Sequence, residues 1–329
     1  MTYLIKPNRR HVLALGAAAI GTQFSPLRAD NHASVNFQLS WLHSVQFGGS
    51  YIAASKGYWD EEGLSVGLTQ GGPNAPVEPP VVSGSALMGI SAADYTAAAV
   101  AEGAPFKIIA VAMQNNPFAI ASLSDNPVKE PADMVGKKIG MSTSNTPVLE
   151  ALCKINGVDI AGIEIVPTQY DAAPLVTGQV DCLLCWATDL PVAMTMQGVA
   201  NEVMLMADFG YAVHSQTYIA TQDSITNRRS ELIGLLKGEV RGWNDYLADT
   251  DAAAALTVEM FPDAGLDLET QKLQAERQVP LMFSELTQAN GFGWFTEDTV
   301  AANIETLALL GRNVGPELWD LSLLEEVHG

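Results

Sequence analysis

The sequence predicts an α/β protein of two lobes, each a sheet flanked by helices, joined by two crossing segments. Three observations support this. Strand-like and helix-like segments alternate from residue 33, the alternation starts again near residue 137, and residues 224–329 have an almost wholly helical pattern. Removing a leader of 29 residues from the 329-residue chain leaves 300, enough for two domains with hydrophobic cores.

The first half contains short apolar runs separated by amphipathic segments. These patterns predict strands at 35–39, 64–69, 87–91 and 106–114, and helices at 46–56, 77–83 and 92–102. Gly57 is expected to stop the first helix. The extended, mostly apolar run 115–124 is interpreted as a crossing into the second lobe.

The second half repeats the pattern. We expect strands at 137–142, 163–168, 180–187 and 203–206, and helices at 146–156, 172–177 and 190–197. Ser144 or Asn145 is expected to cap the helix that begins at 146. Residues 216–221 fit a return crossing. The first lobe is therefore predicted to contain 33–122 and 222–329, and the second lobe 123–221.

Residues 1–29 have the features of an export signal. They contain Lys6, Arg9, Arg10 and Arg28 without an acidic residue, followed by a short apolar run at 12–20. The arginine pair fits a loose twin-arginine signal or an ordinary secretory signal. We expect a soluble periplasmic protein, because no later apolar run is long enough to span a bilayer.

The charge balance excludes two classes of partner. The chain has 37 acidic residues and 17 Lys plus Arg; without the four cations of the leader, 37 acids face 13 cations, a net charge of −24. Such a surface repels nucleic acid and anionic lipid.

The three cysteines include a C-x-x-C pair, Cys182 and Cys185, on a predicted buried strand. Positions i and i+3 of a strand point to opposite faces, and no second Cys pair or His cluster lies nearby. We interpret these thiols as buried apolar groups, and expect no metal, no cofactor and no catalytic residue.

Polar and aromatic residues follow several predicted strands, where ligands of open α/β sheets commonly bind. The candidate ligand-binding residues at these positions are Trp41, His43, Gln46, Ser91, Asp94, Gln114, Asn115, Thr143, Ser144, Asn145, Trp186, Thr188 and Asp189. Tyr170 and Asp171 follow a further strand, and Asp171 fits a cap of the next helix. Asp94 and Asp189 fit a helix cap as well as a ligand contact, and His43 fits the pocket or the surface.

Several motifs resemble one protein family. Residues 46–53 (QFGGSYIA) and 56–66 (KGYWDEEGLSV) look like the opening of ABC-transporter solute-binding proteins, in the branch related to thiamine-pyrimidine-precursor, sulfonate and nitrate binders. Further matching segments are 71–73 (GGP), 82–84 (VSG), 88–91 (MGIS), 131–140 (PADMVGKKIG) and 178–181 (GQVD). The resemblance extends over about residues 35–213.

The resemblance implies a type II-like periplasmic binding-protein fold with two hinge crossings. It implies a monomer that captures a small molecule and presents it to an ABC permease and its ATPase subunit. One alternative is an extracytoplasmic sensor. The other is an enzyme, because fungal relatives of the pyrimidine branch synthesise the thiamine pyrimidine with a His and an iron-binding Cys cluster. This chain has no such cluster.

The distribution of Lys and Arg along the sequence limits the class of ligand that we expect. No Lys or Arg occurs at 42–55, 57–106 or 155–227, so the only cations expected near a candidate turn are Lys137 and Lys138. Anionic ligands commonly gain from a cationic partner. Trp41 and Trp186, one from each lobe, could stack on a planar ring. We therefore expect a heteroaromatic ligand such as a thiamine pyrimidine precursor, with riboflavin, a sulfonate, taurine or nitrate as alternatives.

The resemblance has two departures. Pyrimidine binders of the family often have Pro-Asn-x-x-His after the Trp, where this chain has residues 42–46, LHSVQ. The family's usual Asn is Asp189 here. Both departures concern the predicted pocket, so they bear on the identity of the ligand.

Overall fold

The structure is a computed structural model that describes residues 32–72 and 75–329. The predicted export signal lies outside these residues. Within the described ranges, no helix is both long and apolar enough to cross a membrane.

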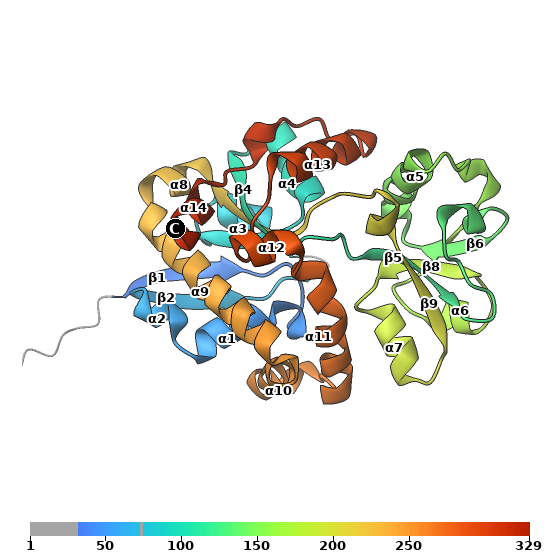
Figure 1. Ribbon diagram of the computed structural model, residues 1–329, viewed down its shortest axis with the longest axis horizontal. Coiled ribbons are helices and arrows are strands. Elements are labelled where there is room, and N and C mark those ends of the chain that lie inside the picture. The colour runs from blue at the N-terminus through green and yellow to red at the C-terminus, as the bar shows by residue number, and fades with distance from the viewer. Residues whose placement is uncertain (1–31, 73–74) are drawn as a thin grey trace, which may run out of the picture. The chain divides into compact units, whose positions relative to one another are not determined.

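The first sheet has five strands in the order β2-β1-β3-β10-β4 (Figure 1). Its strands are β1 (Ala33–Gln38), β2 (Leu64–Thr69), β3 (Met88–Ser91), β4 (Phe106–Met113) and β10 (Ser215–Thr221). β1 pairs with β2 and β3 in parallel, whereas β10 is antiparallel to β3 and β4. The apolar strand β4 lies at the edge of this order but is almost wholly buried. The C-terminal segment covers it, because the Val111 N–H donates to the Gly293 carbonyl and Ile108 forms a bridge with Trp319.

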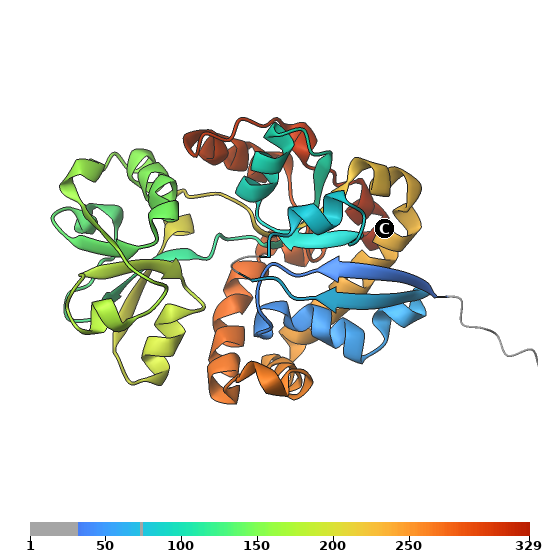
Figure 2. The same cartoon turned by 180° about the vertical axis from the view of Figure 1, so that it is seen from behind.

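Short helices connect the strands of this sheet. They are α1 (Gly48–Ser55), α2 (Tyr58–Glu61), α3 (Glu78–Val82) and α4 (Ala93–Ala101), with a 3-10 turn (Val45–Phe47) before α1. Gly57 has a φ of 68° and separates α1 from α2, as the sequence predicts. Seen from behind, β1 and β2 lie side by side (Figure 2).

The second sheet also has five strands, in the order β7-β6-β8-β5-β9. Its strands are β5 (Phe118–Leu123), β6 (Lys138–Met141), β7 (Glu164–Pro167), β8 (Cys182–Trp186) and β9 (Asn201–Leu205), and its helices are α5 (Thr146–Ile155), α6 (Ala173–Val176) and α7 (Leu190–Met196). The predicted caps of α5 are wrong: neither Ser144 nor Asn145 caps with its side chain. Ser142 accepts the Ser144 N–H instead and caps the 3-10 turn before the helix.

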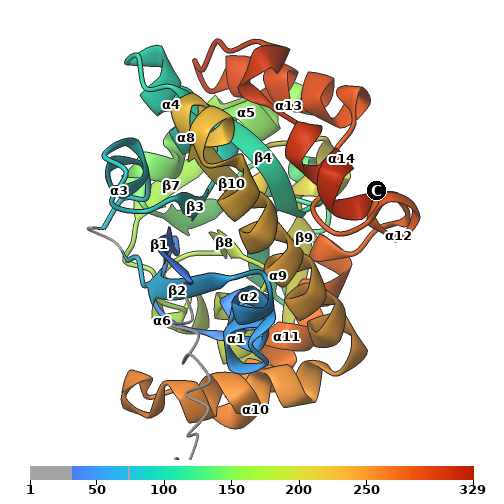
Figure 3. The ribbon, with the colours of Figure 1, turned by 90° about the vertical axis from the view of Figure 1, so that its left-hand side faces the viewer.

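The C-terminal part is helical, as predicted. Its helices are α8 (Gln222–Asn227), α9 (Arg229–Ala248), α10 (Thr250–Met260), α11 (Leu268–Met282), α12 (Glu285–Asn290), α13 (Glu297–Leu309) and α14 (Ser322–His328). The helix α9 packs along α1 and α2 (Figure 3). The helix α11 holds the loop after β1, because Gln271 accepts the Val45 N–H at 2.7 Å and Gln278 donates to the Gln46 carbonyl at 3.4 Å.

Both segments predicted as crossings contain strands. Within 115–124 lies β5, which pairs in the second sheet, and 216–221 lies within β10, which pairs in the first. The connectors between the sheets are 114–117 and 206–214. Both incoming strands are antiparallel to their neighbours because the chain enters each sheet at the edge where the parallel strands end.

Candidate functional site

The carboxyl ends of the parallel strands meet at one edge of each sheet. In the first sheet, the strands that end at this edge are β1, β2, β3 and β4. In the second sheet, they are β6, β7, β8 and β9. The first connector joins these two edges with the four residues 114–117. Such a segment spans at most about 18 Å between the flanking Cα atoms, so the two edges lie near each other.

Exposed aromatic side chains gather at these edges. Among the described residues, Trp41, Tyr95 and Tyr170 are the aromatic residues classed as exposed, at 42%, 66% and 57%. Trp41 follows β1, Tyr95 lies in the first turn of α4 after β3, and Tyr170 follows β7. Exposed aromatic surface concentrated at strand ends is a feature of ligand sites.

The three predicted residues in the loop after β1, which are Trp41, His43 and Gln46, differ in their exposure and contacts. His43 is bound within the first lobe: its Nδ1 lies 2.9 Å from the Tyr51 hydroxyl, and its ring stacks on Phe261 at 3.7 Å. Burial lowers the pKa of His43. Gln46 is half-buried in the 3-10 turn, and its carbonyl accepts from α11. Trp41 alone of the three predicted residues remains exposed.

The loop after β2 approaches the Trp41 loop closely. The Gly71 N–H donates to the Trp41 carbonyl at 2.9 Å. A Cβ at Gly71 would lie 2.5 Å from the Leu39 carbonyl oxygen, so this position requires glycine. The motif glycine therefore supports the loop that presents the Trp41 indole.

Carboxylates lie beside the end of β3. Ser91 is buried, and its hydroxyl donates to Glu78 at 2.5 Å. Asp94 is half-buried in the first turn of α4. Burial raises the pKa of Asp94, although its backbone hydrogen bonds and the charge of Arg312 act in the opposite direction. No side-chain cap is formed at this helix start.

The approach of Arg312 corrects the expectation that Lys137 and Lys138 are the only cations near a candidate turn. Arg312 follows α13, far from Asp94 in sequence, and its charge acts on the Asp94 carboxyl. Glu78, Tyr95 and Arg312 were missed as site residues. A helix start opposite a C-terminal tail has no local signature, so only the fold reveals this group.

The side-chain amides of Gln114 and Asn115 form hydrogen bonds with backbone carbonyls of the protein. The Gln114 amide donates to the carbonyls of Val111 and Trp294 at 2.8 and 3.1 Å. The Asn115 amide donates to the Pro280 carbonyl at 3.4 Å. Both residues therefore attach the first connector to the C-terminal segment.

In the second lobe, Tyr170, Trp186 and Asp189 form a group. The Tyr170 hydroxyl donates to Asp189 Oδ2 at 3.0 Å and accepts the Trp186 N–H at 3.2 Å. Asp189 precedes α7 but does not cap it, so its carboxylate keeps accepting capacity. Burial raises the pKa of Asp189 to about 6, and the Tyr170 hydrogen bond offsets part of this effect. Burial and the Asp189 charge raise the pKa of Tyr170.

The remaining second-lobe residues differ in exposure. Thr143 and Ser144 are exposed, Asn145 is half-buried and Thr188 is buried. Trp186 is half-buried and packs edge-on against Phe118 with ring centroids 6.4 Å apart. These residues lie after β6 and β8, at the same edge as the Tyr170 group. Asp171 accepts the N–H of Ala173, the first residue of α6, at 3.0 Å, but the N-cap residue is Ala172, so Asp171 lies one residue before the expected cap position.

Two of the three cysteines lie on β8, and Cys185 directly precedes Trp186 of the Tyr170 group. Cys153, Cys182 and Cys185 are free and buried. Burial raises the pKa of Cys153 to about 11 and that of Cys182 to about 12, and raises the pKa of Cys185 still further. The thiols are therefore protonated at neutral pH, which makes them poor nucleophiles and poor ligands.

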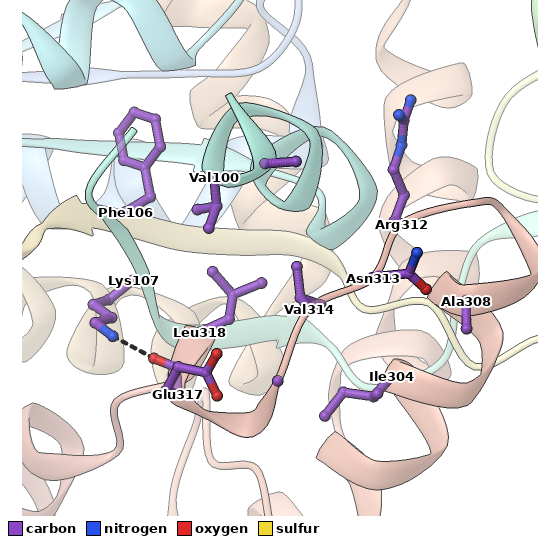
Figure 4. A pocket seen from close by; sticks show the side chains of 12 residues that line it. Val100, Phe106, Lys107, Ile304, Ala308, Arg312, Asn313, Val314, Glu317 and Leu318 are labelled. Carbon is purple, nitrogen blue, oxygen red and sulfur yellow. Dashed lines mark hydrogen bonds between the residues drawn. The ribbon is translucent and has the colours of Figure 1, made fainter. Parts of the chain in front are cut away.

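A pocket of about 490 Å³ lies at the opposite edge of the first sheet (Figure 4). Phe106 and Lys107, at the amino end of β4, line it together with Leu318 and other residues of the C-terminal segment. Lys107 donates to the Glu317 carbonyl across it. Arg312, whose charge acts on Asp94, also lines this pocket. The other lining residues come from the end of α4, the amino end of β4 and the C-terminal segment, so we do not assign the ligand to it.

Comparison with known proteins identifies relatives for most of the chain. The riboflavin-binding protein RibY of Chloroflexus aurantiacus is 28% identical over 271 residues, 79% of this chain and 76% of that protein. The 4-amino-5-hydroxymethyl-2-methylpyrimidine phosphate synthase of Schizosaccharomyces pombe is 25% identical over 150 residues, 45% of this chain and 43% of the synthase.

Solved structures share the fold. The periplasmic aliphatic sulphonate-binding protein SsuA of Escherichia coli superimposes with a TM-score of 0.66 at 16% identity, over 88% of this chain and 91% of SsuA. The prediction of a two-lobed periplasmic binding-protein fold is thereby confirmed. The family model described as "NMT1/THI5 like" matches residues 44–253, more than half of the sequence, and the chain belongs to this NMT1/THI5-like family.

Proposed function

We propose that this protein is the periplasmic solute-binding component of an ABC importer, and that it captures a flat heteroaromatic compound with N–H donors. The candidates are an aminopyrimidine related to the thiamine precursor and a flavin. The two lobes close over the ligand by hinge motion at the connectors 114–117 and 206–214, and the closed form delivers it to a permease.

The observation that carries this proposal is the pairing of aromatic surface with carboxylates at the strand ends. Trp41 and Tyr95 from the first lobe and Tyr170 from the second supply ring faces. Asp189 supplies an acceptor that is not used as a helix cap. A planar ring with N–H groups satisfies both features, since aromatic faces favour stacking and carboxylates only accept.

The charges argue for a neutral or weakly basic ligand. Glu78, Asp94 and Asp189 lie at the candidate edges, with Arg312 as the cation that acts on Asp94. A sulfonate would meet more negative than positive charge there. The sulfonate alternative draws its support from Arg312, which could pair with an anionic group.

An enzymatic role remains a second candidate because the chain matches part of a pyrimidine phosphate synthase. The buried, protonated thiols favour binding over catalysis. Turnover of a bound pyrimidine by the purified protein, followed by mass spectrometry, would favour the synthase alternative.

A ligand screen tests the proposal. The mature protein is titrated with riboflavin, 4-amino-5-hydroxymethyl-2-methylpyrimidine, taurine, an alkanesulfonate and nitrate, while thermal unfolding and intrinsic Trp fluorescence are followed. A heteroaromatic compound at 100 times its Kd is expected to stabilise the fold by about 2.7 kcal/mol. A larger stabilisation by taurine, the alkanesulfonate or nitrate would contradict the proposed ligand class.

A further inference from the structure

Gln216, at the start of β10, has an unusual backbone conformation. Its φ is 44°, and it is the one non-glycine residue with positive φ in the part of the chain that the structure describes. This left-handed region is disfavoured for residues with a Cβ, and glycine occupies it without that cost. The presence of glutamine therefore indicates a requirement for the side chain itself.

The side chain is equally unusual. Gln216 is 1% exposed, and neither Nε2 nor Oε1 has a hydrogen-bond partner among the described residues. Buried amides in folded proteins are nearly always paired. The positive φ and the buried amide without a hydrogen bond each destabilise the folded protein. A structural role therefore does not explain why glutamine occupies this position.

The position of Gln216 is at the candidate site. The next residue, Thr217, pairs with Ser91 at the end of β3 and with Val111 of β4, and Ser215 pairs with Met113. Gln216 thus lies between the carboxyl ends of β3 and β4. It also lies two residues beyond the second connector, 206–214, which joins the two sheets.

The end of this connector is held by three successive carbonyl groups. Those of Ala212 and Val213 accept from the side chains of Asn303 and Asn116, both at 2.6 Å. The His214 carbonyl accepts the Ala93 N–H at 3.0 Å. The backbone before Gln216 is therefore fixed from three directions, which explains how the strained φ persists.

We infer that Gln216 determines ligand specificity by pairing with the hydrogen-bonding edge of the bound ring, an inference that rests on the proposed function. Its amide carries a donor next to an acceptor. An aminopyrimidine presents an amino group next to a ring nitrogen, and a flavin presents an imide N–H next to a carbonyl. Glutamine pairs with such an edge when it recognises adenine. The contact forms when the lobes close over the ligand.

A purely conformational role makes a different prediction. If the strain at Gln216 only shifted the balance between open and closed forms, a substitution would change the affinity for every ligand by the same factor. A residue that pairs with the ligand changes the discrimination between a ligand and its analogue without that edge. Discrimination is therefore the quantity to measure.

The test uses two ligand pairs with Gln216→Gly and the neighbouring control Thr217→Val. One pair is 4-amino-5-hydroxymethyl-2-methylpyrimidine and its analogue without the 4-amino group; the other is riboflavin and its N3-methyl derivative. The unsubstituted protein is expected to prefer the complete edge by at least about tenfold in one pair. Gln216→Gly is expected to reduce that preference to less than about twofold and to raise the unfolding midpoint by about 2–4 °C.

The control isolates the amide. Thr217 Oγ1 is also buried and has no partner in the described part of the chain, so Thr217→Val removes such a group from the same strand. We expect it to retain the ligand preference. The inference is overturned if Gln216→Gly keeps the preference, if it weakens both members of a pair equally, or if it lowers the unfolding midpoint. In each of these cases the unsubstituted protein still binds the heteroaromatic ligand, and the proposed function stands. If the protein binds sulfonates alone, both the Gln216 inference and the proposed function are overturned.

Discussion

At the residue scale, exposure separates ligand candidates from structural residues of the same type. Trp41 is exposed, whereas Trp243 is fully buried and His43, near Trp41 in sequence, stacks on Phe261. The sequence identified the strand-end positions, because strand–helix junctions leave a local pattern. It did not reveal that His43 would be used inside the first lobe, since Phe261 comes from the distant C-terminal segment.

Substitution of the exposed indole tests the stacking contact. Trp41→Ala is expected to weaken heteroaromatic binding by at least about tenfold, because a stacked ring pair contributes about 0.5–1.5 kcal/mol beyond its buried area. Isothermal titration calorimetry provides the measurement. Leu247→Ala is the control, since Leu247 on α9 has the same exposed fraction of 42%. Unchanged affinity in Trp41→Ala would remove this residue from the site.

Asp189 predicts a pH-dependent affinity. Its pKa is raised to about 6, so the carboxylate that we propose as acceptor of a ligand N–H predominates above that pH and is lost as the pH falls through it. We expect affinity to weaken between pH 7 and pH 5. Asp189→Asn is expected to bind more weakly at pH 7 and to show a flatter pH profile. Asp171→Asn, which alters a helix-starting carboxylate, should retain the profile of the unsubstituted protein.

At the element scale, the family-like motif around α1 is largely a packing motif. A Cβ at Gly49 would lie 2.2 Å from the Trp243 ring, and one at Gly242 would lie 2.0 Å from the Gly49 carbonyl oxygen. The small residues thus let α1 and α9 approach closely. Ser50 donates to the buried Glu239 of α9 at 3.0 Å. The motif fixes the helix behind the binding loop rather than the ligand.

Glu239 is a buried ionisable residue in the contact between α1 and α9. Tyr218 donates to Glu239 Oε2 at 2.6 Å and Trp243 donates to the same oxygen at 3.0 Å. Burial raises the pKa of Glu239 to about 7, although these hydrogen bonds and that of Ser50 act in the opposite direction. Burial therefore favours the protonated form of this carboxyl.

The pKa of Glu239 predicts how stability changes with pH. A carboxyl whose pKa is higher in the folded state contributes stability below its unfolded pKa, and that contribution is lost as the pH rises through about 7. Between pH 5 and pH 8 the free energy of unfolding should fall by up to roughly 3 kcal/mol from this group. Glu239→Gln is expected to lose less stability over that range, as measured by urea unfolding. Glu305→Gln, on the exposed surface of α13, controls for the removed charge and should behave like the unsubstituted protein.

At the scale of the whole molecule, two connectors join the sheets and one side chain links them to each other. Asn116, in the first connector, donates to the Val213 carbonyl of the second at 2.6 Å and accepts the Phe118 N–H at 2.9 Å. This residue is buried. The connectors are therefore coupled at the point where the proposed hinge motion occurs.

Removal of this link should destabilise the protein. Asn116→Ala leaves the buried Val213 carbonyl and the partly buried Phe118 N–H without the Asn116 amide, which is expected to cost about 1–3 kcal/mol for the buried carbonyl if it stays unpaired. Urea unfolding measures the loss. Asn313→Ala removes an exposed amide without a side-chain hydrogen bond to the described residues, and is expected to change stability by less than about 0.5 kcal/mol. Equal effects of the two substitutions would argue against a tie between the connectors.

The sequence by itself determined the elements and the class of fold. The strand at 64–69 has the predicted bounds, and the predicted helix at 190–197 differs by one residue from the observed α7. These features follow from local periodicity, capping and glycine positions, which a sequence displays directly. The motifs of residues 46–66 added the family for the same reason, since they are local patterns.

Only the tertiary structure decided which sheet each crossing strand joins and which distant groups meet. The short strands β5 and β10 are not assigned to one sheet by composition, because strand pairing depends on contacts between segments far apart in the chain. The same holds for the charge of Arg312 that acts on Asp94, for His43 against Phe261 and for the Gln216 amide, which has no partner among the described residues. Charge, burial and hydrogen bonding at the site depend on neighbours in space, and these neighbours are fixed by the fold.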